Sequence, residues 1–381
     1  MKRLVLALGV LVSLLAGRAA ADAAPAADLP DGLYARFDSP RGAFVCELFA
    51  AQAPLTVTSF VGLAEGTLAP RGGKPFFTGL KWYRVVPDFV VQSGNPGLED
   101  TGDTPVPYSF PDEFAPGLHH GSAGVLSMAN AGPDTNGCEF FVTLRDTTRL
   151  NYLHAVFGRV VRGLDVLPRI KAGDPFAISI VRVGAAARAF RADQPAFDAR
   201  LAQAKRYAGP AAPGPDAAFD DPDKLLPLDP PRAANFNFKL ANFERATGVK
   251  IVARVFAHSP PEAEDAQPGA YMRALAAKLG TLPRGVLTVY FADEHDWRLW
   301  IGDDRVADFL GRAAVPEDLV EDGALHRAKT AFLEAAAAQA AVYTAEAEKA
   351  APAGQPVTAA QKTKYSVDAV LDALLLKFEP K

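Results

Sequence analysis

The stretch WYRVVPDFVVQSGN, residues 82–95, decides how the first half of the chain is interpreted. Its β-branched and aromatic residues form two short runs separated by Pro87-Asp88, a composition typical of a strand, a turn and a second strand. Arg84 and Gln92 interrupt runs that otherwise suit a buried sheet. Because long polar side chains are rarely buried without a partner, these two residues are the first candidates for a site.

The sequence around this stretch, from residue 33 to 184, consists of short apolar runs separated by Gly, Pro, Asn and Asp. This spacing favours a domain dominated by a sheet or barrel. Two helices are expected. One covers residues 54–65, and a shorter one covers 163–174, with Leu164, Leu167 and Ile170 on one side.

Two further stretches complete a recognisable pattern: GVLSMANAGPDTNGCEFFVTL at 124–144 and LNYLHAVFGRVVRGLDVL at 150–167. In this order, after APLTVTSFVGLAEGT at 53–67, they resemble the cyclophilin family of peptidyl-prolyl cis-trans isomerases. The resemblance covers residues 33–184. It implies a mainly β fold, a closed eight-stranded barrel with two capping helices, in which no cofactor is needed.

The same resemblance implies the roles of individual residues. Arg84 would stabilise a twisted X-Pro amide, Gln92 would hold Arg84 and bind the substrate backbone, and Phe89 would complete the catalytic set. The remaining implied residues bind the substrate; they are Val90, Ala129, Asn130, Glu139, Phe141, Leu150 and His154. The implied partners are unfolded or extended polypeptides that contain proline.

The chain departs from the family pattern at three positions. Glu139 replaces the usual glutamine, and its carboxylate could pair with Arg84 or bind substrate amides differently. Arg149 stands where an aromatic residue, commonly tryptophan, completes the pocket wall, which predicts a more open and polar rim and weak or no binding of cyclosporin. Val90 replaces the usual methionine and keeps the surface apolar.

Composition excludes several other classes. The formal net charge is −4 and no basic tract is present, so the chain is a poor candidate for binding nucleic acid. No sequence motif supports a nucleotide, serine-hydrolase or zinc site. The two cysteines, Cys46 and Cys138, are expected to be unpaired buried thiols, although a single disulfide between them is the alternative.

The N-terminus, MKRLVLALGVLVSLLAGRAAADAAP, has the features of a secretory signal peptide over residues 1–21, with cleavage after Ala21. The alternative is an uncleaved anchor, but the apolar run is shorter than the roughly 20 residues of a membrane span. We therefore expect a periplasmic or secreted protein without a membrane span after cleavage.

The second half of the chain is organised differently. Residues 185–232 are rich in proline and alanine and are expected to form a linker. Residues 233–312 alternate helical and strand patterns, which predicts a smaller α/β domain with a mixed sheet. Residues 313–381 are expected to form a helical C-terminal region.

Residues 235–312 resemble the TPM domain, through LANFERATGVKIVARVF at 240–256 and LPRGVLTVYFADEHDWRLWIG at 282–302. Some members of that family are phosphatases or bind calcium. Acidic residues flank the segment WRLWIG at 297–302 and could ligate calcium or be solvated turn residues; they are Asp293, Glu294, Asp296, Asp303 and Asp304.

Three functions remain open at this point. The first is an exported isomerase that assists the folding of other proteins. The second is a degenerate cyclophilin that binds proline-containing segments without isomerising them, fused to a TPM-like domain. The third places a phosphatase activity in the TPM-like domain, with the barrel as a substrate holder.

Overall fold

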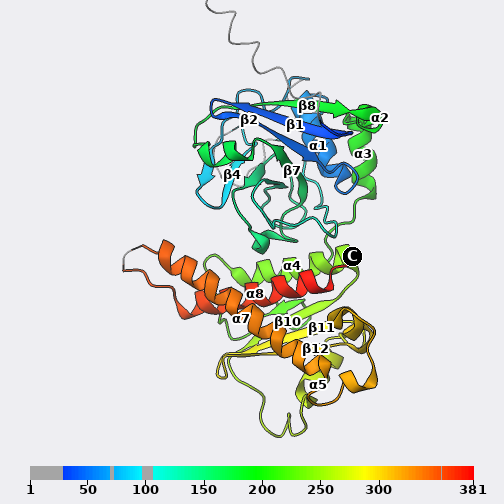
Figure 1. Ribbon diagram of the computed structural model, residues 1–381, viewed down its shortest axis with the longest axis vertical. Helices are drawn as coiled ribbons and strands as arrows, with labels where there is room; N and C mark the ends of the chain where they lie inside the picture. The colour runs from blue at the N-terminus through cyan, green and yellow to red at the C-terminus, as the bar shows by residue number, and fades with distance from the viewer. Residues whose placement is uncertain (1–28, 69–72, 97–105, 353) are drawn as a thin grey trace, which may run out of the picture.

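A computed structural model of the chain describes residues 29–68, 73–96, 106–352 and 354–381. The predicted signal peptide at 1–21 lies outside these residues. The described residues form two units, each built on its own sheet, which lie one above the other in Figure 1. We call residues 29–204 the N-terminal unit and residues 217–381 the C-terminal unit.

The N-terminal unit contains a single sheet of eight strands in the order β3-β4-β6-β5-β7-β2-β1-β8. The strands are β1 (Gly32–Ser39), β2 (Gly42–Leu48), β3 (Arg84–Val86), β4 (Val90–Ser93), β5 (Val125–Met128), β6 (Phe140–Thr143), β7 (Val156–Arg162) and β8 (Ala177–Val183). All neighbouring pairs are antiparallel.

The predicted closed barrel is wrong, because the ladder is open between the edge strands β3 and β8. The two edges meet through an isolated bridge between Lys81 and Pro175 and a hydrogen bond of 3.0 Å from Trp82 N to Asp174 O. Pro175 has no backbone N–H to donate, so a regular ladder cannot continue through this position. The sheet therefore curls without closing.

Helix α1 (Pro54–Glu65) covers one end of the curled sheet, in agreement with the predicted range. Proline suits its first turn, and Gly66 ends it in the left-handed conformation, at φ 77°. The N-terminal N–H groups of the helix have an unusual cap: the carboxylate of Glu113 accepts hydrogen bonds from Leu55 N at 3.0 Å and Thr56 N at 2.7 Å. This contact fastens the loop around residue 113 to the helix.

The second predicted helix, at 163–174, is a short 3₁₀ helix in the structure, η2 (Leu164–Arg169). Pro168 lies inside it and removes a backbone donor, so an α-helix cannot form there. After β8 the chain continues into α2 (Gly184–Ala189) and α3 (Gln194–Gln203), and α3 packs against α1. Phe197 of α3 is fully buried in the core of the N-terminal unit.

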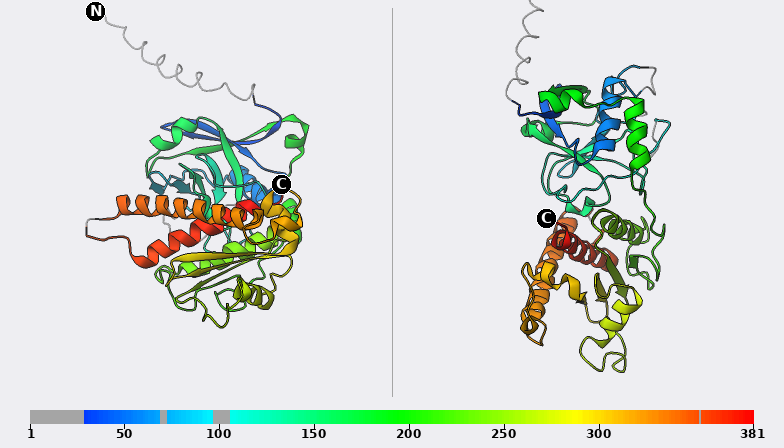
Figure 2. Two further views of the ribbon diagram at one scale, coloured as in Figure 1. Left: turned by 60° about the horizontal axis from the view of Figure 1, so that its bottom comes forward. Right: turned by 90° about the vertical axis from the view of Figure 1, so that its right-hand side faces the viewer.

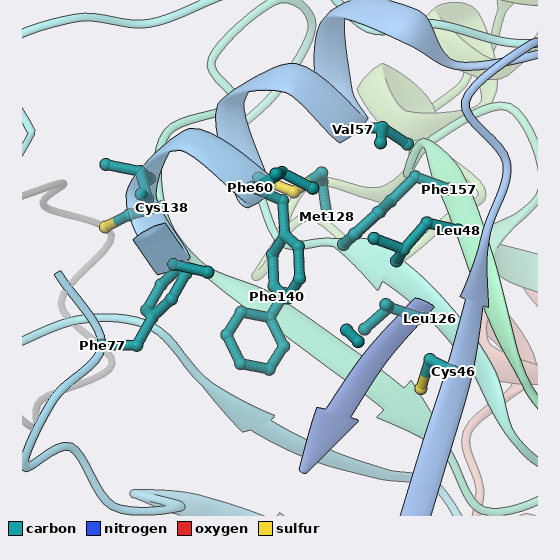
Figure 3. Close-up of a cluster of buried hydrophobic side chains, with 14 of the residues drawn as sticks. Cys46, Leu48, Val57, Phe60, Phe77, Leu126, Met128, Cys138, Phe140 and Phe157 are labelled. Carbon is teal, nitrogen blue, oxygen red and sulfur yellow. The ribbon is translucent and has the colours of Figure 1, made fainter. Parts of the chain in front are cut away.

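Aromatic side chains fill that core, as Figure 3 shows for the cluster between α1 and the sheet. Phe60 of α1 meets Phe140 of β6 edge to face, with ring centroids 5.5 Å apart, a favoured aromatic geometry. Cys46 and Cys138 lie on opposite sides of the cluster in Figure 3. Both are buried free thiols, so the prediction of two unpaired cysteines is confirmed.

The C-terminal unit contains a four-stranded mixed sheet in the order β12-β11-β10-β9. Its strands are β9 (Phe219–Asp220), β10 (Ile251–Phe256), β11 (Val286–Phe291) and β12 (Asp296–Ile301), and only the β11–β12 pair is antiparallel. Its helices are α4 (Arg232–Thr247), α5 (Ala270–Lys278), α6 (Val306–Leu310), α7 (Ala324–Ala350) and α8 (Ala359–Phe378), with short 3₁₀ turns η3 (Asp303–Arg305) and η4 (Pro316–Asp318).

Helices cover both faces of this sheet. Apolar residues of α4 and α8 pack on one face, and Met272 and Ala276 of α5 pack on the other. Figures 1 and 2 show α4 and α8 between the four-stranded sheet and the N-terminal unit. Helices α4 and α8 therefore lie next to both units.

Several contacts join the two units. Tyr152, which follows the 3₁₀ helix η1 (Thr148–Leu150), is buried in the core cluster of the C-terminal unit, and its hydroxyl donates a short hydrogen bond to Glu379. Its ring meets Phe243 of α4 edge to face at 5.0 Å. Arg245 of α4 pairs with Asp134 at 2.9 Å. Apolar burial and paired charges thus hold the units in a defined arrangement.

Candidate active site

The hairpin β3–β4 places Arg84 and Gln92 side by side. The two strands pair antiparallel with Arg84 opposite Gln92, and Gln92 is in turn opposite Phe141 of β6. The turn that joins the strands contains Asp88 in the left-handed conformation, at φ 54°, which aspartate tolerates better than most residues. Side chains from three adjacent strands therefore point to one surface of the sheet.

That surface carries a pocket of about 260 Å³. Nine of the ten residues proposed from the sequence line it: Arg84, Phe89, Val90, Gln92, Ala129, Asn130, Phe141, Leu150 and His154. Glu139, the tenth, is buried beside Gln92 and hydrogen-bonded to it. Residues separated by up to 70 positions in the sequence thus meet around one cavity with apolar walls and polar groups on one side.

Gln92 connects the polar groups of this pocket. Arg84 Nη1 donates to Gln92 Oε1 at 2.8 Å, while Gln92 Nε2 donates to the hydroxyl of Tyr83 at 2.9 Å and to Glu139 Oε2 at 3.2 Å. A carboxylate only accepts hydrogen bonds, so Glu139 requires the NH₂ end of the Gln92 amide to face it. The carbonyl end is thereby turned toward Arg84.

Glu139 is the anchor of this network. It is 7% exposed and also accepts a hydrogen bond of 2.6 Å from the Tyr83 hydroxyl and one of 2.9 Å from Asn95 Nδ2. Among the described residues, no ion pair joins Glu139 to Arg84. Of the two alternatives left open by the sequence, direct pairing with Arg84 is thus absent, whereas a different binding of substrate amides stays a prediction. Glu139 contacts Gln92, which in turn contacts Arg84.

Two histidines support the aromatic wall. His154 meets Phe141 edge to face, with centroids 5.5 Å apart, and its Nδ1 lies 3.0 Å from Met128 O. His120 stacks on Phe141 with centroids 5.8 Å apart and is fully buried. Burial lowers the pKa of His154 to about 4 and that of His120 to about 3. Both rings are therefore neutral at pH 7 and act as part of the wall.

The loop that follows β5 forms another side of the pocket. Asn130 Nδ2 donates to Leu153 O at 2.9 Å and to Asp112 Oδ1 at 3.2 Å. Asp112 also accepts from Asn136 Nδ2 at 2.8 Å, and burial raises its pKa to about 6. The carboxyl of Asp112 therefore organises the whole loop, and with it the backbone of Ala129 and Asn130.

The surroundings of Arg149 differ from those predicted. It lies on η1 and its guanidinium is 5.5 Å from the ring centroid of Tyr343, a residue of α7. Arg149 is not among the described residues that line the proline pocket, although its neighbour Leu150 is. A cation over an aromatic face is a favourable contact, so Arg149 joins the two units one residue before Leu150.

The acidic residues around β12 do not form a ligand cluster: the described residues contain no group of three or more His, Cys, Asp or Glu side chains that could hold a metal ion. Asp293 accepts from Ser259 N at 2.9 Å, Glu294 pairs with Arg298 at 3.0 Å, and Asp304 faces Arg284 at 3.3 Å. These carboxylates are occupied by local partners.

Several residues of the site were not identified from the sequence. Tyr83 and Asn95 lie within or at the end of the quoted stretch, but alternation alone did not separate them from the core. His120 is next to a second histidine, which is a weak signal. Asn235, Phe238 and Asn242 of α4 lie against the loop at 130–133, and no local pattern indicates a contact between segments 100 residues apart.

Comparisons with known proteins agree with this geometry. Residues 34–185 match the family model described as cyclophilin type peptidyl-prolyl cis-trans isomerase/CLD. The chain is 43% identical over 135 residues to "Peptidyl-prolyl cis-trans isomerase-like 1" of Aspergillus fumigatus, an alignment that covers 35% of this chain and 79% of that protein. It is 44% identical over 131 residues to the isomerase ppi1 of Schizosaccharomyces pombe, which covers 34% of this chain and 79% of that protein.

Among solved structures, a cyclophilin type isomerase of Cryptosporidium parvum aligns with 40% of this chain and 98% of its own, at 26% identity and a TM-score of 0.35.

The curated relatives correct the predicted location. They are proteins of fungi, whose cells have no periplasm enclosed by an outer membrane, so the assignment to the periplasmic or secreted proteins is wrong. Among the described residues, no helix is long and apolar enough to cross a membrane.

The family model matches residues 34–185, which include the pocket, and the relatives are named for the same activity. The N-terminal unit is accordingly a peptidyl-prolyl cis-trans isomerase, and the chain belongs to the cyclophilin-type family of these enzymes.

Proposed function

We propose that the pocket between β3, β4, β6 and η1 isomerises X-Pro bonds in unfolded or extended polypeptides, with Arg84 as the catalytic residue. Amide resonance imposes a barrier of about 18–20 kcal/mol on rotation of a peptide bond. The reaction breaks no covalent bond between heavy atoms. The enzyme has only to bind the proline and favour the twisted amide over the planar one.

Arg84 supplies the electrostatic part of this task. As the bond twists, the proline nitrogen regains a lone pair, to which a guanidinium can donate. Gln92 holds the guanidinium in place through the 2.8 Å bond to Nη1 and is itself held by Tyr83 and Glu139. A preorganised donor needs no rearrangement during the reaction, and each ~1.4 kcal/mol of selective stabilisation accelerates the reaction tenfold.

The apolar walls supply the remaining part. Phe89, Val90, Phe141 and Leu150 are placed to receive the proline ring and to exclude water from it. The backbone of Ala129 and Asn130 and the rim residue His154 border the path of an extended peptide.

The observation that carries the proposal is that nine of the ten residues implied by the family resemblance line one pocket. The test is exchange NMR of a short X-Pro peptide with the full chain and with the Arg84→Ala variant. We expect acceleration by the parent and its loss in the variant. If the peptide binds to the parent without acceleration, the protein is instead a binding module for proline-containing segments.

For the rest of the chain we propose the division derived from the sequence: an isomerase domain at 33–184, a linker at 185–232, a TPM-like domain at 233–312 and a helical region at 313–381. Within that linker only residues 205–216 lie between the units, because α2 and α3 pack on the N-terminal unit and β9 belongs to the sheet of the C-terminal unit. The mixed sheet with helices on both faces supports an α/β domain. Limited proteolysis is expected to cut first within residues 205–216, which form no helix or strand. A first cut inside 233–312 would contradict this division.

A further inference from the structure

A second cavity adjoins the proline pocket. It has a volume of about 210 Å³ and shares Asn130 and His154 with the proline pocket. The loop at 130–133 and Leu153 form one side of it. The other side belongs to the C-terminal unit and consists of Asn235, Phe238 and Asn242 of α4.

The sequence of α4 explains how one helix serves both the core and this cavity. Phe236, Leu240 and Phe243 are buried in the core of the C-terminal unit. Asn235, Phe238 and Asn242 follow one another at spacings of three and four, which places them along a second stripe of the same helix. A helix with an apolar stripe and a separate amide and aromatic stripe has two different partners.

Asn242 gives an independent indication of a ligand. It is 1% exposed, and its Nδ2 donates to Tyr152 O at 2.9 Å. Its amide oxygen is buried and has no hydrogen-bond partner among the described residues. An unsatisfied buried acceptor is unfavourable, and a backbone N–H of a bound peptide is a donor that would satisfy it.

The wall formed by α4 is fixed relative to the loop that it faces. Arg245, one helical turn after the cavity residues, pairs with Asp134, and both side chains are less than 15% exposed. The Arg245 guanidinium also lies 5.7 Å from the ring centroid of Phe114. A cavity between two such connected elements is present before the substrate arrives, which lowers the cost of binding.

We propose that α4 of the C-terminal unit completes the substrate groove, so that a polypeptide bound by its proline continues past Asn130 into the cavity against Asn235, Phe238 and Asn242. The cavity has an aromatic ring and two amides on the α4 side, and its lining contains no Asp, Glu, Lys or Arg side chain. The occupant is therefore an extended, uncharged segment with an aromatic or aliphatic residue near the X-Pro bond. This inference rests on the proposed function of the proline pocket.

The test compares two kinds of peptide on the full chain. The first is a four-residue X-Pro peptide, and the second is a set of twelve-residue peptides that carry phenylalanine at successive positions on either side of the proline. We expect kcat/KM from exchange NMR to be at least fivefold higher for the best long peptide than for the short one. Replacing its phenylalanine by glutamate should remove this advantage.

Two variants assign the effect to α4. Phe238→Ala and Asn235→Ala should each reduce the ratio of long-peptide to short-peptide kcat/KM at least threefold, whereas Glu244→Ala, on an exposed position of the same helix, should leave it unchanged. An unchanged ratio in both cavity variants, with folding verified by circular dichroism, would overturn the inference. Asn235 is only half-buried, so its variant remains informative if Phe238→Ala is unstable.

A separate measurement, the Kd for the long peptide, distinguishes a failure of the proposed isomerase function from a failure of the proposed groove. If the parent accelerates neither peptide, the isomerase mechanism fails, and calorimetric Kd values for the long peptide are compared instead. A threefold or greater weakening by the two cavity variants would then support the groove as a binding site. Equal Kd values would overturn it.

Discussion

Replacement of Glu139 by alanine tests whether the polar network behind the pocket controls Arg84. The substitution removes a buried acceptor that receives hydrogen bonds from Tyr83, Gln92 and Asn95 at 2.6, 3.2 and 2.9 Å. Glu139 itself does not line the proline pocket, and of its three hydrogen-bond partners only Gln92 does. Any effect on catalysis must therefore pass through Gln92.

The structure gives the scale of the effect. Each lost hydrogen bond costs about 1 kcal/mol net, so the free energy of unfolding should fall by about 3 kcal/mol. The Gln92 amide retains its bond to Tyr83 but is no longer fixed with its carbonyl toward Arg84. If ~1.4 kcal/mol of transition-state stabilisation is lost with that orientation, kcat falls about tenfold.

Urea unfolding and exchange NMR of an X-Pro peptide measure the two quantities. Glu139→Gln is the matched control, because it keeps the shape and one acceptor oxygen; its kcat should stay within about threefold of the parent, in line with the glutamine usual at this position in the family. A Glu139→Ala protein with the kcat of the parent would refute the positioning role of Glu139, whatever its stability.

Three further predictions concern the pH response, the buried ion pair between α4 and α8, and the binding of cyclosporin. Burial lowers the pKa of His154 from its ordinary value of 6.5 to about 4, so His154 binds a proton more tightly in the unfolded chain than in the folded protein. The free energy of unfolding should therefore fall as the pH drops from about 6.5 to 4. Urea unfolding at pH 7 and pH 5 measures this dependence, and the difference between the two free energies of unfolding should be smaller for His154→Gln than for the parent. An equal difference in the two proteins would contradict the prediction. Lys239→Met leaves the buried Asp372 carboxylate without its ion-pair partner and should lower the free energy of unfolding by about 3 kcal/mol. The double variant Lys239→Met/Asp372→Leu should recover this stability. A Lys239→Met protein as stable as the parent would contradict a stabilising role of the ion pair. Cyclosporin should bind weakly or not at all, because Arg149, next to Leu150 on η1, supplies no aromatic wall and its guanidinium lies over Tyr343 of α7; a tight complex in an NMR titration would contradict this.

The quoted stretch predicted the strand, turn and strand that carry Arg84 and Gln92, because β-branched runs and a Pro-Asp turn are local signals. The pocket residues followed from a family resemblance, not from spacing. Helix α1 was predicted with its observed bounds, since its apolar periodicity and Pro54 both lie within one segment.

The features that were missed depend on contacts between distant segments. Closure of a barrel depends on whether β3 can pair with β8, and those strands are about 90 residues apart. The helix expected at 163–174 is a short 3₁₀ helix in the structure, and Pro168 explains why. The prediction relied on the spacing of the apolar residues and gave too little weight to this proline. The partners of Arg149 and of the loop at 130–133 come from α7 and α4, which no pattern near the pocket could indicate.

The most direct test of the account measures kcat and peptide affinity separately for Arg84→Ala in the full chain. If Arg84 stabilises the twisted amide, kcat should fall by about 100-fold, equivalent to ~2.7 kcal/mol, while the Kd for an X-Pro peptide changes less than threefold. A variant that retains kcat and loses affinity would show that Arg84 only binds the substrate, and would contradict the mechanism proposed for this pocket.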